Sequence, residues 1–269
     1  MSLAQVAVIQ FPGVNCEAES VRALKRVGLE AVVFRWTRRA SELRDFQAYL
    51  LPGGFSYQDR VRAGALAAKD PLLDVLAGEA DKGKPVLGIC NGAQVLVEAG
   101  LVPGGESIGL ALATNRMPDR EGYYSRWIHV RIESSPCVFT RGIAPGTVLP
   151  LPMAHGEGRF TAESSSVVSL AAAGQVPLRY ARPEGEAASG FPDNPNGAAA
   201  DAAAVCNRRG NVLALMPHPE RAQDLGALAR TVPGAWGERR DRALAAGEPD
   251  QPGPGLELFS ALRRHLEER

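Results

Sequence analysis

Short apolar runs alternate with helical periodicity through the first hundred residues of the chain. The apolar runs predict buried strands at residues 5–11, 31–34, 48–51 and 85–89. Between them, apolar residues recur at helical spacing and predict one helix that Asn15 caps and Gly28 ends, and two more over residues 71–80 and 93–99. Strands that alternate with helices form βαβ units, so we expect an α/β fold with a mainly parallel sheet.

The second half of the chain has a weaker pattern. Its apolar or alternating runs predict strands at residues 127–133, 148–153 and 212–216, and its Gly-, Pro-, Ala- and Asn-rich stretch predicts a loop at residues 182–200. We expect an irregular insertion over residues 222–255, followed by an amphipathic terminal helix over residues 256–266. Because the chain contains no internal repeat and no clear linker, we expect a single domain over residues 1–269.

The composition is that of an ordinary globular protein without net charge. Hydrophobic residues make up 45% and charged residues 22% of the 269 positions, as is typical of globular domains. The 30 basic and 30 acidic side chains cancel, so no broad field attracts nucleic acid or an anionic membrane. We therefore expect neither partner.

The cysteines predict reduced thiols, not a disulfide framework or a zinc site. Cys16, Cys90, Cys137 and Cys206 are far apart in the sequence and form no C-x-x-C pair. The first residues, MSLAQVAVIQF, lack a basic segment, and no apolar run is long enough for a signal peptide or a membrane span. We therefore expect a cytoplasmic protein whose site holds no metal.

A G-x-C-x-G motif at residues 88–92 gives the strongest chemical indication. It lies between a predicted strand and a predicted helix, and its small flanking residues permit the sharp turn that exposes the nucleophile of α/β-hydrolases. The helix N-terminus after Cys90 also favours the thiolate. A buried structural cysteine is the alternative for an isolated thiol, but the two glycines favour a nucleophile.

A nucleophilic cysteine needs a base, and His218 in the M-P-H-P-E sequence at residues 216–220 is the candidate. The two prolines force extended geometry on the residues before them, and residues two apart in an extended segment face the same side. Glu220 can therefore orient the His218 imidazole, which completes a triad with Cys90. A rigid surface loop is the alternative, and the cysteine motif makes it the weaker interpretation.

The P-G-G-F loop at residues 52–55 follows a predicted buried strand and offers unobstructed backbone N–H groups. This loop could supply half of an oxyanion hole, with the amide of Asn91 supplying the rest. A Gly-Gly pair after a strand often marks only a turn. Because this pair lies beside the strand that leads to the predicted nucleophile, the oxyanion-hole interpretation is favoured over a simple turn.

A series of ordered motifs resembles one family of enzymes. The motifs are PGVNCEAE, LLPGGFSYQDRVRAGA, GICNGAQ, AHGEGRF, NPNGA and MPHPERA, and they extend from the N-terminus to about residue 222. Together they resemble the class I glutamine amidotransferases. Within that class, they are similar to the glutaminase subunit of phosphoribosylformylglycinamidine synthase.

The resemblance implies a flavodoxin-like, three-layer fold with helices on both faces of the sheet. It implies Cys90 as the nucleophile, His218 as the base and then the acid, and Glu220 as the group that orients the imidazole. It further implies that the N–H groups of Gly54 and Asn91 hold the oxyanion. The residues implied to bind the substrate or support the site are Gly53, Phe55, Gln94, His155 and Arg159.

The resemblance also implies a reaction and partners. A subunit of this kind hydrolyses glutamine to glutamate and ammonia through a cysteine thioester. The ammonia passes to a synthetase subunit, which uses ATP and Mg to make formylglycinamidine ribonucleotide in purine biosynthesis. Whether a small third subunit takes part in the complex is left open. We expect no cofactor in this chain, which has no G-x-x-x-x-G-K phosphate loop.

Several alternatives stay open at this point. The chain could be an amidotransferase for another synthetase, a flavodoxin-like cysteine hydrolase, or a scaffold subunit with a decayed site. The H-P-E pair argues against the hydrolase, and the complete triad argues against decay. Gln58 stands where the family has glycine in F-S-Y-G-D, which leaves the geometry of that loop open. Cys16 matches a family cysteine, and we expect it to be structural.

Overall fold

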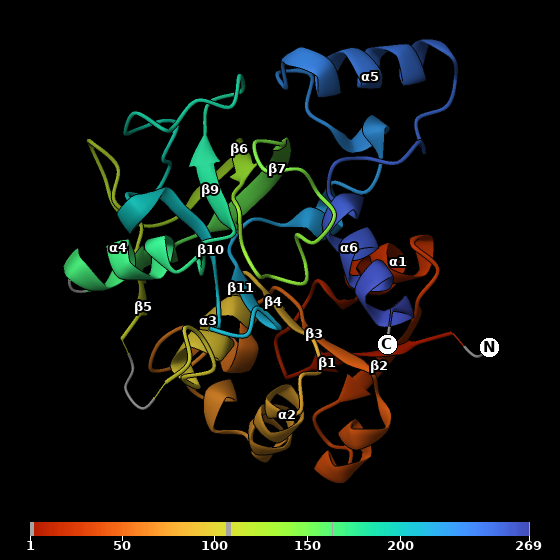
Figure 1. Cartoon of the computed structure of the whole chain (residues 1–269), viewed down its shortest axis with the longest axis vertical. Coiled ribbons are helices and arrows are strands. Elements are labelled where there is room, and N and C mark those ends of the chain that lie inside the picture. The colour runs from red at the N-terminus through yellow and green to blue at the C-terminus, as the bar shows by residue number, and fades with distance from the viewer. Residues whose placement is uncertain (1–2, 106–108, 163, 269) are drawn as a thin grey trace.

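The fold is built on a mixed sheet in the order β2-β1-β3-β4-β11-β10-β9-β6-β7 (Figure 1). The computed structural model describes residues 3–105, 109–162 and 164–268. Parallel pairing joins β2 (Glu30–Arg35), β1 (Gln5–Gln10), β3 (Ala48–Leu51), β4 (Val86–Ile89) and β11 (Val212–Leu215). Antiparallel pairing then adds β10 (Ala202–Cys206), β9 (Leu178–Ala181), β6 (Tyr124–Ile132) and β7 (Val148–His155). A separate antiparallel pair consists of β5 (Ala111–Thr114) and β8 (Glu157–Thr161).

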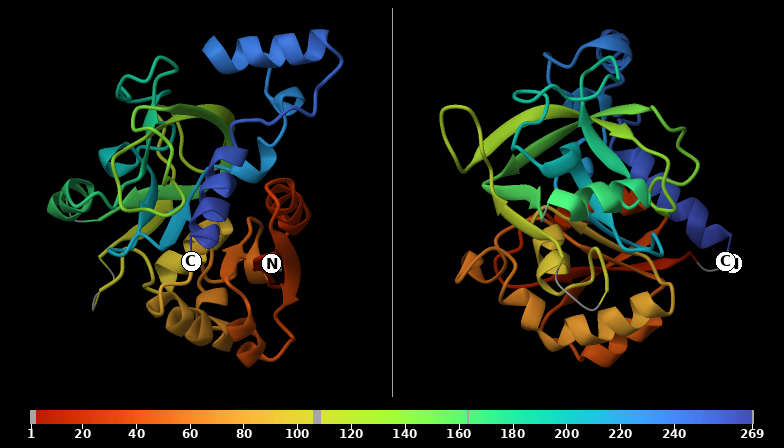
Figure 2. Two further views of the ribbon diagram at one scale, coloured as in Figure 1. Left: turned by 45° about the vertical axis from the view of Figure 1, so that its right-hand side comes forward. Right: turned by 60° about the vertical axis from the view of Figure 1, so that its left-hand side comes forward.

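Helices lie on both sides of the parallel strands. The helices are α1 (Glu17–Arg26), α2 (Pro71–Asp81), α3 (Asn91–Glu98), α4 (Ser164–Ala172), α5 (Gly234–Ala245) and α6 (Leu256–Glu267). Figure 1 shows α1 and α6 together on one side of the parallel strands and α2 on the other, and Figure 2 shows the same arrangement from two further directions. Among the described residues, no helix is long and apolar enough to cross a membrane.

The parallel part of the sheet confirms the predicted α/β fold, and its central strands are buried on both faces. Residues 6–9 of β1 and all four residues of both β3 and β4 are buried. Strands covered by helices on both faces need continuous apolar sequence, which is the pattern that predicted them. The antiparallel strands β9 and β10 are short, and the sequence pattern did not predict them.

The start of α1 differs from the prediction by one residue. The N-cap is Cys16 and not Asn15, and no side chain caps this helix. The reason is a tertiary contact, because the N–H groups of both residues donate to the carbonyl oxygen of Gly53. The helix ends as expected, with Gly28 in the left-handed region at φ +81.

The predicted irregular insertion over residues 222–255 contains a helix, α5, so that expectation was wrong for residues 234–245. Its buried positions include Gly237, Arg240 and Ala243. Arg240 is tied down by donating to the carbonyl oxygens of Ala229 and Val232. An inward face of glycine, arginine and alanine shows no apolar stripe, which is why helical periodicity did not predict the element. Figure 1 shows α5 at the periphery of the molecule.

A close backbone approach fixes the junction between β4 and α3. A Cβ built on Gly92 would lie 2.0 Å from the carbonyl oxygen of Leu51, and one on Gly88 would lie 2.5 Å from the carbonyl oxygen of Gly92. Contacts of that length do not occur in real structures. The α3 N-terminus can therefore lie against the end of β3 only because these two residues lack side chains.

This contact predicts opposite effects for two glycine substitutions. Gly92→Ala should lower the free energy of unfolding by about 1–3 kcal/mol or more, because Leu51 must move. Gly78→Ala in α2, where a Cβ meets nothing within 4 Å, should raise it by about 0.5–1 kcal/mol. Urea denaturation of both variants measures the difference, and equal stabilities would contradict the argument.

Candidate active site

The predicted catalytic residues lie where parallel strands end. Cys90 directly follows β4, and residues 218–220 follow β11, the strand paired with β4. The loop at residues 52–55 follows β3 on the other side of β4. The carboxyl ends of parallel strands meet at one edge of a sheet, which is the usual place for a site in open α/β folds. The topology therefore brings together three segments that are far apart in the sequence.

Cys90 occupies a strained turn. Its backbone has φ 51 and ψ −105, a region that residues with a side chain rarely adopt. Its N–H donates to the carbonyl oxygen of Leu215 at 2.8 Å, so the turn is joined to the strand that leads to His218. The side chain is mostly buried but reaches the cavity described below. This is the geometry of a nucleophile elbow.

His218 and Glu220 form a short buried pair. The Nδ1 atom of His218 lies 2.6 Å from Oε1 of Glu220, and both side chains are buried. The contact arises differently from the prediction, because residues 219–221 form a 3-10 turn and not an extended segment. Burial alone would lower the pKa of His218, but the charges of Glu220 and Cys90 raise that pKa well above its usual value. The imidazole is therefore poised to carry a proton beside the Cys90 sulfur.

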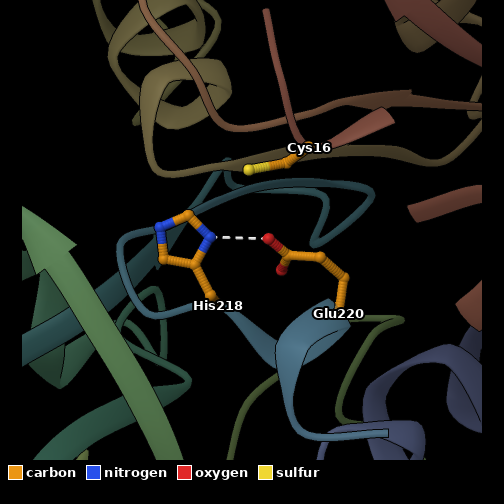
Figure 3. Close-up of side chains that lie close together, drawn as sticks. All are labelled: Cys16, His218 and Glu220. Atoms are coloured by element: carbon orange, nitrogen blue, oxygen red, sulfur yellow. Dashed lines mark hydrogen bonds and ion pairs between the residues drawn. The ribbon is translucent and has the colours of Figure 1, made fainter. Parts of the chain in front are cut away.

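A second thiol, that of Cys16, lies beside this pair (Figure 3). Gly53 separates the groups: a Cβ built on it would lie 2.8 Å from Cε1 of His218, 3.2 Å from Sγ of Cys16 and 3.5 Å from Cβ of Cys90. The absence of a side chain at Gly53 therefore creates the space in which the imidazole and both cysteines meet. The structure gives Gly53 a steric role, and its contact with the substrate stays a prediction.

Cys16, His218 and Glu220 each present a possible metal ligand, and these atoms lie within 4.8 Å of one another. Their observed contacts are hydrogen bonds. Arg221 donates from Nη2 to the Cys16 sulfur at 3.1 Å, while Glu220 accepts from the imidazole. A guanidinium so close to the sulfur repels a cation, so we interpret the cluster as support for His218.

The cavity in front of Cys90 has a volume of about 310 Å³. Most of the predicted site residues line it: Gly54, Phe55, Cys90, Gln94, His155 and His218. Phe55 is half-exposed at its mouth, together with Tyr123. Arg159 does not line the cavity, and its Nε atom donates to the carbonyl oxygen of Thr114. A role of Arg159 in supporting the site or contacting a partner stays a prediction.

Asn91 links the oxyanion region to the wall of the cavity. Its Oδ1 accepts from the N–H of Ser56, and its Nδ2 donates to Oδ1 of Asp59 and to Oε1 of Gln94, each at 3.0 Å. Gln94 in turn donates to the carbonyl oxygen of Glu157 at 2.6 Å. The backbone N–H of Asn91 belongs to the first turn of α3, whose amides have no partner within the helix.

His155 is held neutral in one orientation. Asn115 Nδ2 lies 3.2 Å from Nδ1 of His155 and donates to its carbonyl oxygen at 2.7 Å, so Nδ1 is an acceptor and the proton sits on Nε2. Burial, followed by the charge of nearby His218, lowers the pKa of His155 to about 3. The ring needs Gly158, because a Cβ there would lie 2.0 Å from Cε1 of His155. This explains the second glycine of A-H-G-E-G-R-F.

The N-P-N-G motif supports the same segment, residues 155–158. Asn196 donates from Nδ2 to the carbonyl oxygen of Gly158 at 2.8 Å, and Asn194 accepts from the N–H groups of Gly197 and Ala198. Residues 182–200 form the predicted loop up to the 3-10 turn at Ala199–Asp201. The motif therefore acts on the site through the backbone that carries His155.

The loop after β3 has three successive residues in the left-handed region. Gln58 has φ +61, between Tyr57 at +53 and Asp59 at +50. A left-handed conformation is unstrained for glycine and costs other residues about 1 kcal/mol or more. Gln58 nevertheless adopts it, and its Oε1 accepts from Arg60 at 3.0 Å. The geometry that this residue left open is therefore the left-handed one.

Comparison with known proteins agrees with this geometry. The family model for the CobB/CobQ-like glutamine amidotransferase domain matches residues 4–265. Phosphoribosylformylglycinamidine synthase subunit PurQ of Methanothrix thermoacetophila is 42% identical over 98% of this chain and 99% of its own. The PurQ of Thermus thermophilus is 43% identical over 81% of this chain and 89% of its own.

Solved structures extend the comparison. PurLQS from Thermotoga maritima contains a chain that covers 91% of this one and 99% of itself, with a TM-score of 0.67 and 30% identity. Another glutamine amidotransferase from that organism has a TM-score of 0.53 at 15% identity with full coverage of both chains, a likeness of fold alone. A cysteine elbow, a histidine–glutamate pair and this fold define a glutamine amidotransferase. Within that class, the chain belongs to the PurQ family of phosphoribosylformylglycinamidine synthase subunits.

The buried pair predicts how His218 titrates. Glu220→Gln should lower the pKa of His218, because the carboxylate that stabilises the imidazolium is lost. NMR titration of the histidine Cε1–H signals measures this pKa, and the His218→Asn variant identifies which signal belongs to His218. The signal of His129, whose pKa burial lowers, serves as the control and should not move. An unchanged His218 titration would contradict the inferred charge pair.

The same pair has a consequence for stability. Because the folded-state pKa of His218 lies above its unfolded value of about 6.5, the protonated form stabilises the fold below that pH. This contribution is lost as the pH rises through the folded-state pKa. The difference in unfolding free energy between the parent chain and Glu220→Gln should therefore shrink with rising pH, in urea titrations repeated across that range.

Proposed function

We propose that this chain hydrolyses the side-chain amide of glutamine at Cys90 and supplies the ammonia to a synthetase subunit. The observation that carries the proposal is that Cys90 on its elbow and His218, which is hydrogen-bonded to Glu220, line one cavity. The chain around them is 42% identical to a PurQ subunit over nearly the whole of both proteins. Glutamine is the substrate, and ammonia and glutamate are the products.

In the first half-reaction, the Cys90 thiolate adds to the carboxamide carbon. The N–H groups of Gly54 and Asn91 hold the oxyanion that forms, since Gly54 lines the cavity and the Asn91 amide belongs to the first turn of α3. The His218 imidazolium then protonates the amide nitrogen. The C–N bond breaks, ammonia departs, and a γ-glutamyl thioester remains on Cys90.

The second half-reaction uses the same imidazole as a base. The sulfur has no charge in the thioester, so one of the groups that raise the pKa of His218 is gone. His218 can then take a proton from water as its oxygen adds to the thioester carbon. Collapse of this adduct releases glutamate and restores the thiolate and the imidazolium. Glu220 orients the ring throughout.

The proposed acceptor of the ammonia is the synthetase subunit that makes formylglycinamidine ribonucleotide with ATP and Mg. The Thermotoga maritima relative was solved as PurLQS, which supports PurL as the synthetase and PurS as a small third subunit. The four cysteines are free and buried, as suits a reducing cytoplasm. We therefore place the reaction in the cytoplasm, in a complex that holds its nucleotide in another chain.

Removal of the nucleophile should separate the two activities. With the synthetase subunit, ATP and formylglycinamide ribonucleotide, Cys90→Ala should lower glutamine-dependent synthesis by at least about a thousandfold. Synthesis from ammonium chloride should be unchanged, because the acceptor site lies in another chain. Product formation from each nitrogen source measures both rates.

Cys137→Ala is the matched control, since Cys137 is a buried thiol outside the cavity. This variant should keep both activities. Loss of ammonia-dependent synthesis in Cys90→Ala would contradict the proposal that ammonia is released in this chain and used in another. Retention of glutamine-dependent synthesis in that variant would count against the nucleophile.

A further inference from the structure

Charged side chains are distributed unevenly around the cavity in front of Cys90. Asp59 and Glu157 line one wall, where the Asp59 carboxylate accepts from Asn91 and the backbone carbonyl of Glu157 accepts from Gln94. Arg221 lines the side on which Cys16 and His218 lie. The triad needs none of the three charges for the chemistry at the amide. Their placement requires another explanation.

Asp59 is the better positioned of the two acids. Its Oδ1 accepts from Asn91, and Asn91 is adjacent to Cys90 in the chain, so the carboxylate is fixed relative to the nucleophile. Among the described residues, no cation lies within ion-pair distance of either Asp59 or Glu157. Burial raises the pKa of Asp59, hydrogen bonds from Asn91 and Gly64 oppose that effect, and the charge of Glu157 adds to it. A cation bound in the cavity would offset both the burial of the Asp59 carboxylate and its repulsion by Glu157.

The substrate carries such a cation. Glutamine is a zwitterion whose α-ammonium lies at the far end of the molecule from the amide that Cys90 attacks. We propose that the Asp59 carboxylate binds the α-ammonium of glutamine and selects α-amino acid amides over simple amides. This inference rests on the proposed glutaminase reaction. Arg221, on the other side of the cavity, makes the opposite orientation of the zwitterion unfavourable.

The proposal assigns a specificity role to a residue outside the triad. The γ-carboxamide reaches Cys90 in the correct position only when the ammonium is held at Asp59. Reagents that lack an ammonium gain nothing from this carboxylate. The contribution of Asp59 can therefore be separated from that of the elbow by comparing two reagents for the same sulfur.

The test measures alkylation of Cys90 in the full-length chain. 6-Diazo-5-oxo-L-norleucine carries the α-ammonium and α-carboxylate of glutamine, whereas iodoacetamide is small and uncharged. Asp59→Asn keeps an oxygen that can accept from Asn91, so the loop contact survives the change. The second-order rate with the glutamine analogue should fall about 10- to 100-fold, the effect of losing one charge-assisted hydrogen bond. The rate with iodoacetamide should not change.

Asp119→Asn is the matched control, because Asp119 is exposed and does not line the cavity. Both of its rates should equal those of the parent chain. An equal fall with both reagents in Asp59→Asn would mean that the residue only supports the elbow, and no fall with either would also overturn the proposal. Failure of the analogue to label the parent chain, while iodoacetamide does, would instead reject the proposed glutaminase reaction.

Discussion

The contact between the carbonyl oxygen of Leu51 and the backbone of Gly92 sets the position of the whole site. It allows α3 to begin at the end of β3, and this forces Cys90 into its left-handed turn. The same approach places the first amides of α3 beside the loop at residues 52–55. The nucleophile and the two proposed oxyanion donors thus depend on one steric condition. A side chain at Gly92 would disturb all three.

The electrostatics of the site depend on a second close approach, at Gly53. The imidazole of His218 occupies space that any side chain at this position would fill. Glu220 and Cys90 then act on the imidazole from two directions, against the cost of its burial. In the proposed reaction, the charge on the sulfur changes, whereas the charge of the carboxylate remains. One histidine can therefore serve first as acid and then as base without moving.

The sequence predicts the parallel half of this fold well and the remainder poorly. Strands covered on both faces leave continuous apolar runs, whereas the Ala-rich β10 and the inward-facing Arg240 of α5 resemble loop sequence. The three residues of the predicted triad, which the structure brings together, could be named from the sequence because G-x-C-x-G and H-P-E are local patterns. Asp59 and Asn115 carry no such pattern, because their contacts with Asn91 and His155 form only when distant segments pack. The turn at residues 219–221 was missed because two prolines also suit an extended segment.

Two histidines line the cavity, and their pKa values are shifted in opposite directions, that of His218 upward and that of His155 downward. Burial, followed by the charge of His218, lowers the pKa of His155 to about 3, so this ring stays uncharged near neutral pH. The field that His218 experiences from that wall is therefore constant when the acidity of the medium changes. Asn115, which donates to Nδ1 of this ring, fixes the orientation in which the neutral imidazole lies in the cavity wall.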